Sequence, residues 1–253
     1  MLWHKAWLDT RWRFLIGLGL LLFTAIVNVL AYPSVPGILR AAARAERNGL
    51  DAGDITAAAQ LATSFRGYIW IQFVHENLYF LWTLFAALLG ATRPFLQRSD
   101  AVFTFSLPIS RRRLFAVSAA TDLVELSGLA LIPLLLIVLM ASVVGQTYAL
   151  ADALVHAIHV FVGGAVFYGT ARLLATVFDD RWKQILIPLT LGIVAAQCAR
   201  LIPMWTPFNP ASVMVGESYF RTGVPAWMGL FVWLGVATAI LYISMRLLER
   251  RDL

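Results

Sequence analysis

The sequence predicts an all-α membrane protein that crosses the bilayer six times and forms a single transmembrane domain over residues 1–253. Composition is the first observation: 60% of the 253 residues are hydrophobic and only 13% are charged. An ordinary globular domain carries about 25% charged residues, so this chain lacks the polar surface of a water-soluble protein. The second observation is a series of long apolar runs, each close to the roughly 20 helical residues that cross a 30 Å hydrocarbon core.

Six segments have the length and apolar character of a transmembrane helix. Lipid-exposed backbone must satisfy its own hydrogen bonds, which restricts such segments to helices. Those at 14–32, 126–148 and 226–245 are uncharged, whereas the other three carry His75, Glu76, Arg172 and Arg200. The predicted spans are residues 14–32, 68–91, 126–148, 153–178, 185–202 and 226–245. The single cysteine, Cys198, excludes an intrachain disulfide.

Basic residues predict the orientation of these spans. Thirteen Lys and Arg residues lie on the side of both termini, against five on the other side, which are Arg40, Arg44, Arg47, Arg66 and Arg221. Cytoplasmic loops carry the excess of Lys and Arg, so both termini are expected in the cytoplasm. An even number of spans agrees with this placement.

The segments outside the spans carry further expectations. Tryptophans and basic residues alternate in residues 2–13, which predicts an N-terminal interfacial helix or, equally, an aromatic anchor for the first span. In the outer segment 33–67, Asp54 can cap a helix, and apolar residues then recur at helical spacing. The second helix is therefore expected to begin near residue 55. Residues 203–224 contain three prolines and are predicted to form an interfacial or re-entrant piece.

The cytoplasmic loop 92–116 has a distinct pattern. Ser99 or Asp100 can cap a short helix that runs to Leu107, Pro108 ends it, and Ser110 can cap the next helix. Topology selection accounts for much of the arginine run 111–113. It does not account for Phe103 and Phe105 on the cytoplasmic side, an apolar surface that a soluble partner would bury.

Several catalytic motifs are missing from the sequence. Lys5 and Lys183 are the only lysines, and neither follows a glycine-rich loop, so the chain has no phosphate-binding P-loop. His75 and Glu76 begin like a zinc-binding H-E-x-x-H motif, but Tyr79 stands where the second histidine belongs. No G-x-S-x-G nucleophile motif occurs either. We therefore expect no catalytic residues, no bound cofactor and no ATP hydrolysis by this chain alone.

Ionisable residues within the spans are candidates for function because their burial is costly. His75 and Glu76 are candidates for a transport role, with pairing to Arg200 as the structural alternative. Asp122 and Glu125 are expected to pair with Arg172 or with residues 111–113. Asp152, His156 and His159 share one helical face and could bind a metal, but their loose spacing also fits a face exposed to water, and we predict no metal site.

The chain resembles the type-2 ABC-transporter permeases. The resemblance rests on residues 2–13 followed directly by a span, on six spans with both ends inside, and on the run Phe105-Ser-Leu-Pro-Ile-Ser-Arg-Arg-Arg-Leu114. It implies a multi-pass protein of the cytoplasmic membrane, surrounded by lipid, in which two permease chains pair as a homodimer or a paralogous heterodimer. Each chain would dock an ATPase subunit that holds ATP and Mg, and the assembly would export a substrate. Nucleic acid is not an expected partner.

The resemblance also implies roles for particular residues. Spans two and five commonly border the pathway in this family, which places Gln72, His75, Glu76 and Gln197 near it. Residues 100–107 would form the coupling helix, and 179–182 a second, smaller contact. The implied ATPase contacts are Asp100, Phe103, Phe105, Ser106, Leu107, Pro108, Ser110, Arg111, Asp179, Asp180, Arg181 and Trp182.

Two other classes of function remain open from the sequence. An ion- or proton-coupled secondary transporter could use His75, Glu76 and Arg200, although the sequence shows no convincing internal repeat of the kind such transporters contain. The other class is an intramembrane enzyme or a non-transporting membrane scaffold; of these the enzyme is less favoured, because no nucleophile or metal triad is present.

Overall fold

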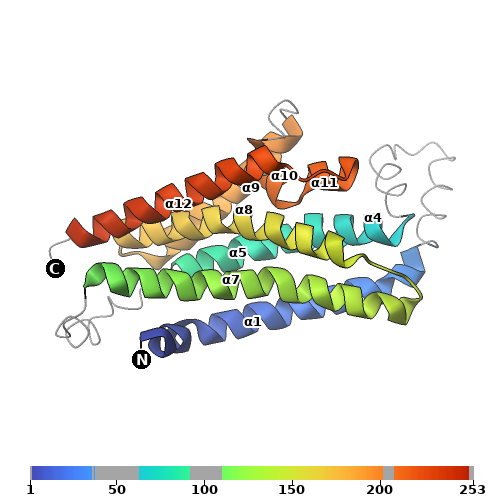
Figure 1. Ribbon diagram of the computed structural model, residues 1–253, viewed down its shortest axis with the longest axis horizontal. Coiled ribbons are helices and arrows are strands. Elements are labelled where there is room, and N and C mark those ends of the chain that lie inside the picture. The colour runs from blue at the N-terminus through green and yellow to red at the C-terminus, as the bar shows by residue number, and fades with distance from the viewer. Residues whose placement is uncertain (1, 36, 38–62, 92–109, 202–207, 251–253) are drawn as a thin grey trace.

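The computed structural model describes residues 2–35, 37, 63–91, 110–201 and 208–250, and within these ranges it is helical, with turns and no strand. Figure 1 shows a bundle of long helices lying side by side along its longest axis. The helices are α1 Leu2–Ala31, η1 Tyr32–Ser34, α4 Phe65–Ile69, η2 Trp70–Leu78, α5 Tyr79–Gly90, α7 Arg111–Ala141, η3 Ser142–Val144, α8 Leu150–Val177, α9 Arg181–Leu201, α10 Pro210–Met214, α11 Glu217–Thr222 and α12 Trp227–Arg250.

Five of the helical segments are long and apolar enough to cross a membrane, so the chain is a multi-pass membrane protein. They are Leu2–Ser34, Phe65–Gly90, Arg111–Val144, Leu150–Val177 and Trp227–Arg250. They correspond to the predicted spans one, two, three, four and six. Helix α9 occupies the place of the predicted fifth span and packs against α8 and α5, but it is not one of the five.

Both chain termini lie at one end of the bundle in Figure 1, which we call the terminal end. The start of α7 and the turn between α8 and α9 lie there too. The start of α4, the end of α7 and helix α11 lie toward the other end, which we call the opposite end.

Two expectations about helix ends are wrong. Residues 2–13 do not form a separate interfacial helix, because α1 runs unbroken from Leu2 to Ala31. This stretch contains no proline, so nothing interrupts the backbone hydrogen bonds before the apolar run. The second helix does not continue from residue 55. Ser64 is extended, with φ −99° and ψ 145°, and its side chain caps a helix that begins at Phe65.

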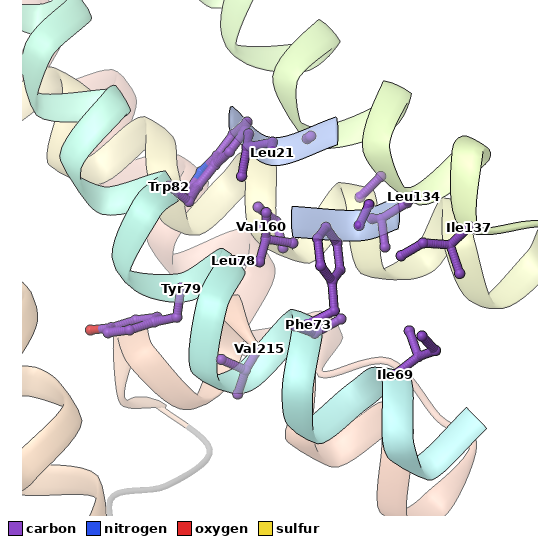
Figure 2. Packing of buried hydrophobic residues seen from close by; sticks show 14 of the residues in the cluster. Leu21, Ile69, Phe73, Leu78, Tyr79, Trp82, Leu134, Ile137, Val160 and Val215 are labelled. Atoms are coloured by element: carbon purple, nitrogen blue, oxygen red, sulfur yellow. The ribbon is translucent and has the colours of Figure 1, made fainter. Parts of the chain in front are cut away.

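Helix α8 lies at the centre of the bundle, where it contacts α5, α7, α9, α10 and α12. Small residues on α8 let its neighbours approach closely, as is common where membrane helices pack. A Cβ atom at Gly163 would lie 2.6 Å from the Cβ of Met214, and one at Gly164 would overlap Trp82. Figure 2 shows Trp82 and Leu78 packed with Leu21, Val160 and Leu134, so the core joins α1, α5, α7 and α8.

Candidate functional site

The second predicted span contains a π-helical segment, η2, over Trp70–Leu78. Segments of π-helix are rare and occur often at functional sites, because they redirect side chains. The Trp70 indole donates a hydrogen bond of 2.9 Å to the Val215 carbonyl, and its ring stacks on Phe220 with centroids 4.3 Å apart. These contacts fix η2 against α10 and α11. They come from a segment 145 positions away in the sequence, so helical periodicity in 68–91 did not reveal them.

Residues His75 and Glu76 of η2 line a half-open pocket of about 230 Å³. His75 Nδ1 lies 3.5 Å from Glu76 Oε1, and the two side chains are 39% and 53% exposed. The lining includes Tyr79, whose hydroxyl donates a hydrogen bond of 2.6 Å to the Gly192 carbonyl of α9. We call this the polar pocket; its lining residues are His75, Glu76, Tyr79, Phe80, Ala196, Ala211, Ser212, Val215 and Glu217.

The structure places the four predicted pathway residues differently. His75 and Glu76 line the polar pocket, whereas Gln72 and Gln197 are exposed and do not line it. Glu76 faces no described arginine as an ion-pair partner; the side chain of Arg200, the proposed partner, lies outside the described part of the structure. Sequence reasoning missed Ser212 and Glu217. Their segment was recognised as broken by prolines, but nothing in its spacing shows that it packs against the second helix.

Asp152 joins three elements toward the opposite end of the bundle. Arg66 Nε lies 3.0 Å from Asp152 Oδ2, and the Tyr219 hydroxyl donates a hydrogen bond of 2.7 Å to Asp152 Oδ1. The Arg66 guanidinium also lies over the Tyr219 and Phe220 rings. Partial burial and the bond to Asp152 raise the pKa of Tyr219. We call Arg66, Asp152 and Tyr219 the outer clamp, because it ties α4, α8 and α11 together.

The two histidines beside the outer clamp are buried and do not face water. His156 and His159 are fully buried, so the expectation that this face meets water is wrong. The described residues contain no group of three or more His, Cys, Asp and Glu side chains placed to hold a metal ion. Gly216 comes close to His156, with 3.0 Å between a Cβ built there and Nδ1, so the connection between α10 and α11 covers these rings.

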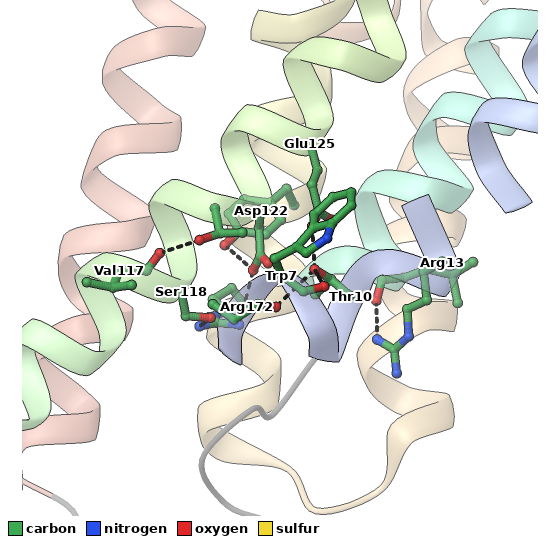
Figure 3. A network of polar contacts seen from close by, with 12 residues as sticks. Trp7, Thr10, Arg13, Val117, Ser118, Asp122, Glu125 and Arg172 are labelled. Atoms are coloured by element: carbon green, nitrogen blue, oxygen red, sulfur yellow. Dashed lines mark hydrogen bonds and ion pairs between the residues drawn. The ribbon is translucent and has the colours of Figure 1, made fainter. Parts of the chain in front are cut away.

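A second polar network lies among α1, α7 and α8 (Figure 3). Arg172 Nη1 lies 3.4 Å from Asp122 Oδ2, which also accepts a hydrogen bond of 2.9 Å from the Tyr168 hydroxyl. Arg172 Nη2 donates to Ser118 Oγ at 2.7 Å. Glu125 accepts a hydrogen bond from Thr10 of α1. The expected pairing of Asp122 with Arg172 is confirmed, whereas the hydrogen-bond partner shown for Glu125 is Thr10 and not an arginine.

The structure describes some of the predicted ATPase contacts and not others. Asp100, Phe103, Phe105, Ser106, Leu107 and Pro108 lie in 92–109, outside the described residues. Ser110 caps α7 as predicted, since its Oγ accepts a hydrogen bond of 3.3 Å from the Arg113 N–H. Arg111 begins that helix.

The second predicted contact, Asp179–Asp180–Arg181–Trp182, forms the exposed turn between α8 and α9. Asp180 Oδ1 accepts a hydrogen bond of 2.9 Å from the Trp182 N–H, which fixes the start of α9. The Trp182 side chain is 70% exposed. The described residues thus place an exposed turn at the terminal end and a half-open polar pocket toward the opposite end. The chain matches no family model, no curated protein and no solved structure.

Proposed function

We propose that this chain is the permease subunit of an ABC transporter, and that it exports a substrate across the cytoplasmic membrane. ATP and Mg would be held by a separate ATPase subunit, and the chain itself would catalyse no reaction. The observation that carries the proposal is the placement of the exposed 179–182 turn at the same end as the Ser110 cap of α7. Residues that resemble two contacts of one ATPase therefore share one end of the molecule.

The geometry of α7 supports the transmission of a displacement from the ATPase to the substrate pathway. The helix starts directly after the predicted coupling segment and continues for 31 residues, which is about 46 Å at 1.5 Å per residue. It packs against α1 and α8, and α8 carries the α10 contacts beside the polar pocket. A push on residues 100–107 would move the first turn of α7, and the helix would transmit the displacement along the bundle.

The proposal includes six spans and a second permease chain. Helix α9 would be the fifth span, which agrees with the appearance of both termini at one end of the bundle. This end would face the cytoplasm, since it carries the excess of basic residues.

Purification from native membranes tests the proposal. We expect a tagged chain, extracted in mild detergent, to bring a stoichiometric ATPase subunit that mass spectrometry identifies. The double variant Phe103→Asp with Phe105→Asp should lose this subunit, and Trp182→Asp should reduce its yield, because each places a charge on an apolar contact surface. Val224→Asp, on an exposed turn near the start of α12, is the matched control and should retain the subunit. Recovery of the chain alone in several detergents would contradict the proposal.

One observation favours a second candidate, a proton-coupled secondary transporter. The polar pocket joins a histidine and two carboxylates on a π-helical segment and the wall that faces it, and such groups can carry protons. If this candidate is right, purified chain in proteoliposomes should take up protons, detected by an internal pH-sensitive dye, without any ATPase. Glu76→Gln and His75→Ala should abolish the signal; uptake that persists in both variants would exclude a coupling role for the pair.

A further inference from the structure

A second pocket of about 300 Å³ lies directly beside the polar pocket. Ser212 and Glu217 line both pockets, so α10 and the start of α11 form a shared wall. The second pocket is largely apolar, and we call it the apolar pocket; its lining residues are Phe208, Ser212, Val213, Glu217, Ser218, Arg221, Thr222, Ala226, Trp227, Met228 and Gly229.

Hydrogen bonds to four different helices hold this shared wall in place. The Asn209 side chain donates to the Ala195 carbonyl of α9 at 2.8 Å, and its Oδ1 accepts from the Ala211 N–H at 2.8 Å. The Trp233 indole of α12 donates to the Phe208 carbonyl at 2.9 Å. Trp70 of η2 binds the carbonyl of Val215 at the end of α10, and the outer clamp joins α11 to α8. A preformed wall lowers the ordering cost of binding, so these pockets are suited to a ligand.

The two pockets differ in the chemistry that they offer. The polar pocket has the carboxylates of Glu76 and Glu217, the rings of Tyr79 and Phe80, and the hydroxyl of Ser212. Arg221, which lines the apolar pocket, lies 3.0 Å from Glu217. Among the described residues, Glu76 pairs with its neighbour His75. Counted with His75 neutral, the two carboxylates and Arg221 leave one unbalanced negative charge, and this charge and the aromatic faces favour a cation. The apolar pocket offers Val213, Trp227 and Met228 to an alkyl or aryl group.

We propose that the paired pockets bind an amphiphile with a cationic head group, such as a primary or quaternary amine that carries one alkyl tail. The head occupies the polar pocket beside Glu76, and the tail extends past Ser212 and Glu217, which line both pockets, into the apolar pocket. This assignment rests on the proposed function, since it identifies the class of substrate. Neither pocket alone exceeds the small end of the roughly 300–1,000 Å³ range typical of ligand sites, whereas their combined volume falls within that range.

Equilibrium binding to the purified full-length chain tests the assignment without an ATPase. The probe is radiolabelled decyltrimethylammonium, and the chain is held in nanodiscs of phosphatidylcholine, with empty nanodiscs to correct for partition into lipid. We expect saturable binding. Unlabelled tetramethylammonium should compete at least about tenfold more weakly, because it lacks the tail, and decyl sulfate should not compete at all.

Variants separate the two halves of the site. Glu76→Gln should weaken decyltrimethylammonium binding about tenfold, the loss expected for one charge-assisted contact, whereas Glu249→Gln on α12 should leave it unchanged. Met228→Ala should weaken the decyl probe but not tetramethylammonium, and Val232→Ala, one turn further along the same helix, should affect neither. No saturable binding, or equal competition by decyl sulfate, would overturn the assignment while leaving the ATPase association intact.

The amine could come from the aqueous phase or from a lipid head group, and the nanodisc composition distinguishes these sources. Replacing phosphatidylcholine, whose head group is a quaternary amine, by the neutral and amine-free lipid digalactosyldiacylglycerol should lower the apparent Kd of the probe if amine-bearing lipids occupy the site. An unchanged Kd assigns the site to soluble amines. Both results support a site for cationic amphiphiles only if Glu76→Gln weakens binding of the probe. If this variant binds the probe as tightly as the unmodified chain, the proposed site is overturned.

Discussion

At the scale of single residues, the ion pair of Asp122 and Arg172 depends on its surroundings, because both charges are buried. Their side chains are 1% and 5% exposed, so neither charge is stabilised by water. Tyr168 and Ser118 supply hydrogen bonds that complete the pair, and the Arg172 guanidinium lies 5.2 Å from the centroid of the Phe115 ring. Because both partners are desolvated, the loss of one leaves the other buried without compensation.

Arg172→Ala should destabilise the folded chain by roughly 3 kcal/mol, in the range found when one member of a buried pair is removed. Unfolding in detergent, followed by circular dichroism against a denaturant, measures the change. Arg246→Ala is the matched control, since Arg246 forms an exposed pair with Glu249 and its loss should not change stability measurably. Equal effects of the two variants would show that the Asp122 pair is solvated.

At the scale of the elements, close helix packing depends on particular glycines of α8 and the helices beside it. A side chain at Gly164 would overlap the Trp82 indole of α5, and Trp82 is fully buried. At Gly235 on α12, by contrast, nothing lies within 4 Å of the position that a Cβ atom would take. Glycine is therefore needed for close packing at position 164 but not at position 235, although both positions are helical.

Gly164→Ala should destabilise the bundle by about 1–3 kcal/mol, because α5 must shift or Trp82 must leave its rotamer. Gly235→Ala should be neutral or stabilising by up to about 1 kcal/mol, since alanine is the better helix former and meets no neighbour. Thermal unfolding in one detergent, with both variants side by side, gives the comparison. A destabilising Gly235→Ala and a neutral Gly164→Ala would contradict the packing described here.

The outer clamp makes the attachment of α11 sensitive to alkaline pH. The pKa of Tyr219 is raised above its ordinary value of 10.0, first by burial and then by the hydrogen bond to Asp152. The folded state therefore favours the protonated hydroxyl. This contribution is fully present below about pH 10 and is lost as the pH rises through the folded-state pKa.

The Tm of the chain should consequently fall more steeply above about pH 10 than that of Tyr219→Phe, which has no hydroxyl to ionise. Differential scanning fluorimetry at a series of pH values measures both slopes. Tyr242→Phe provides a control, because Tyr242 bonds to the exposed Arg246 on α12 rather than to the clamp. Parallel slopes for the chain and for Tyr219→Phe would exclude the clamp as the source of the pH dependence.

At the scale of the whole molecule, the number of crossings depends on α9. If α9 crosses the membrane, Arg112 and Val224 lie on opposite sides; if it does not, they lie on the same side. Helix α9 carries Pro188 and begins with Arg181, Trp182 and Lys183, so its apolar part is shorter than its 21 residues.

Cysteine labelling in a Cys198→Ser background should resolve this. Arg112→Cys should react with a membrane-impermeant maleimide only after the membrane is opened, whereas Val224→Cys should react in intact cells, because the terminal end is expected in the cytoplasm. Val224 is 57% exposed, so the introduced thiol is accessible. Labelling of both positions only after opening the membrane would exclude the six-span arrangement.

The amino-acid sequence by itself determined the membrane class of this protein, most helix positions and the Ser110 cap of α7. These features are local, since about twenty consecutive apolar residues can satisfy their backbone only as a helix, and a capping side chain acts within one turn. His75 and Glu76 were recognised for the same reason, because charged groups inside an apolar run are costly wherever the chain goes.

Only the tertiary structure decided which distant segments meet. The π-helical segment Trp70–Leu78 and the contribution of Ser212 and Glu217 to the polar pocket involve contacts between α10–α11 and the second helix. The burial of His156 and His159 depends on the cover provided by Gly216. Periodicity in one segment carries no information about such contacts, because they arise from the packing of side chains that lie far apart in the sequence.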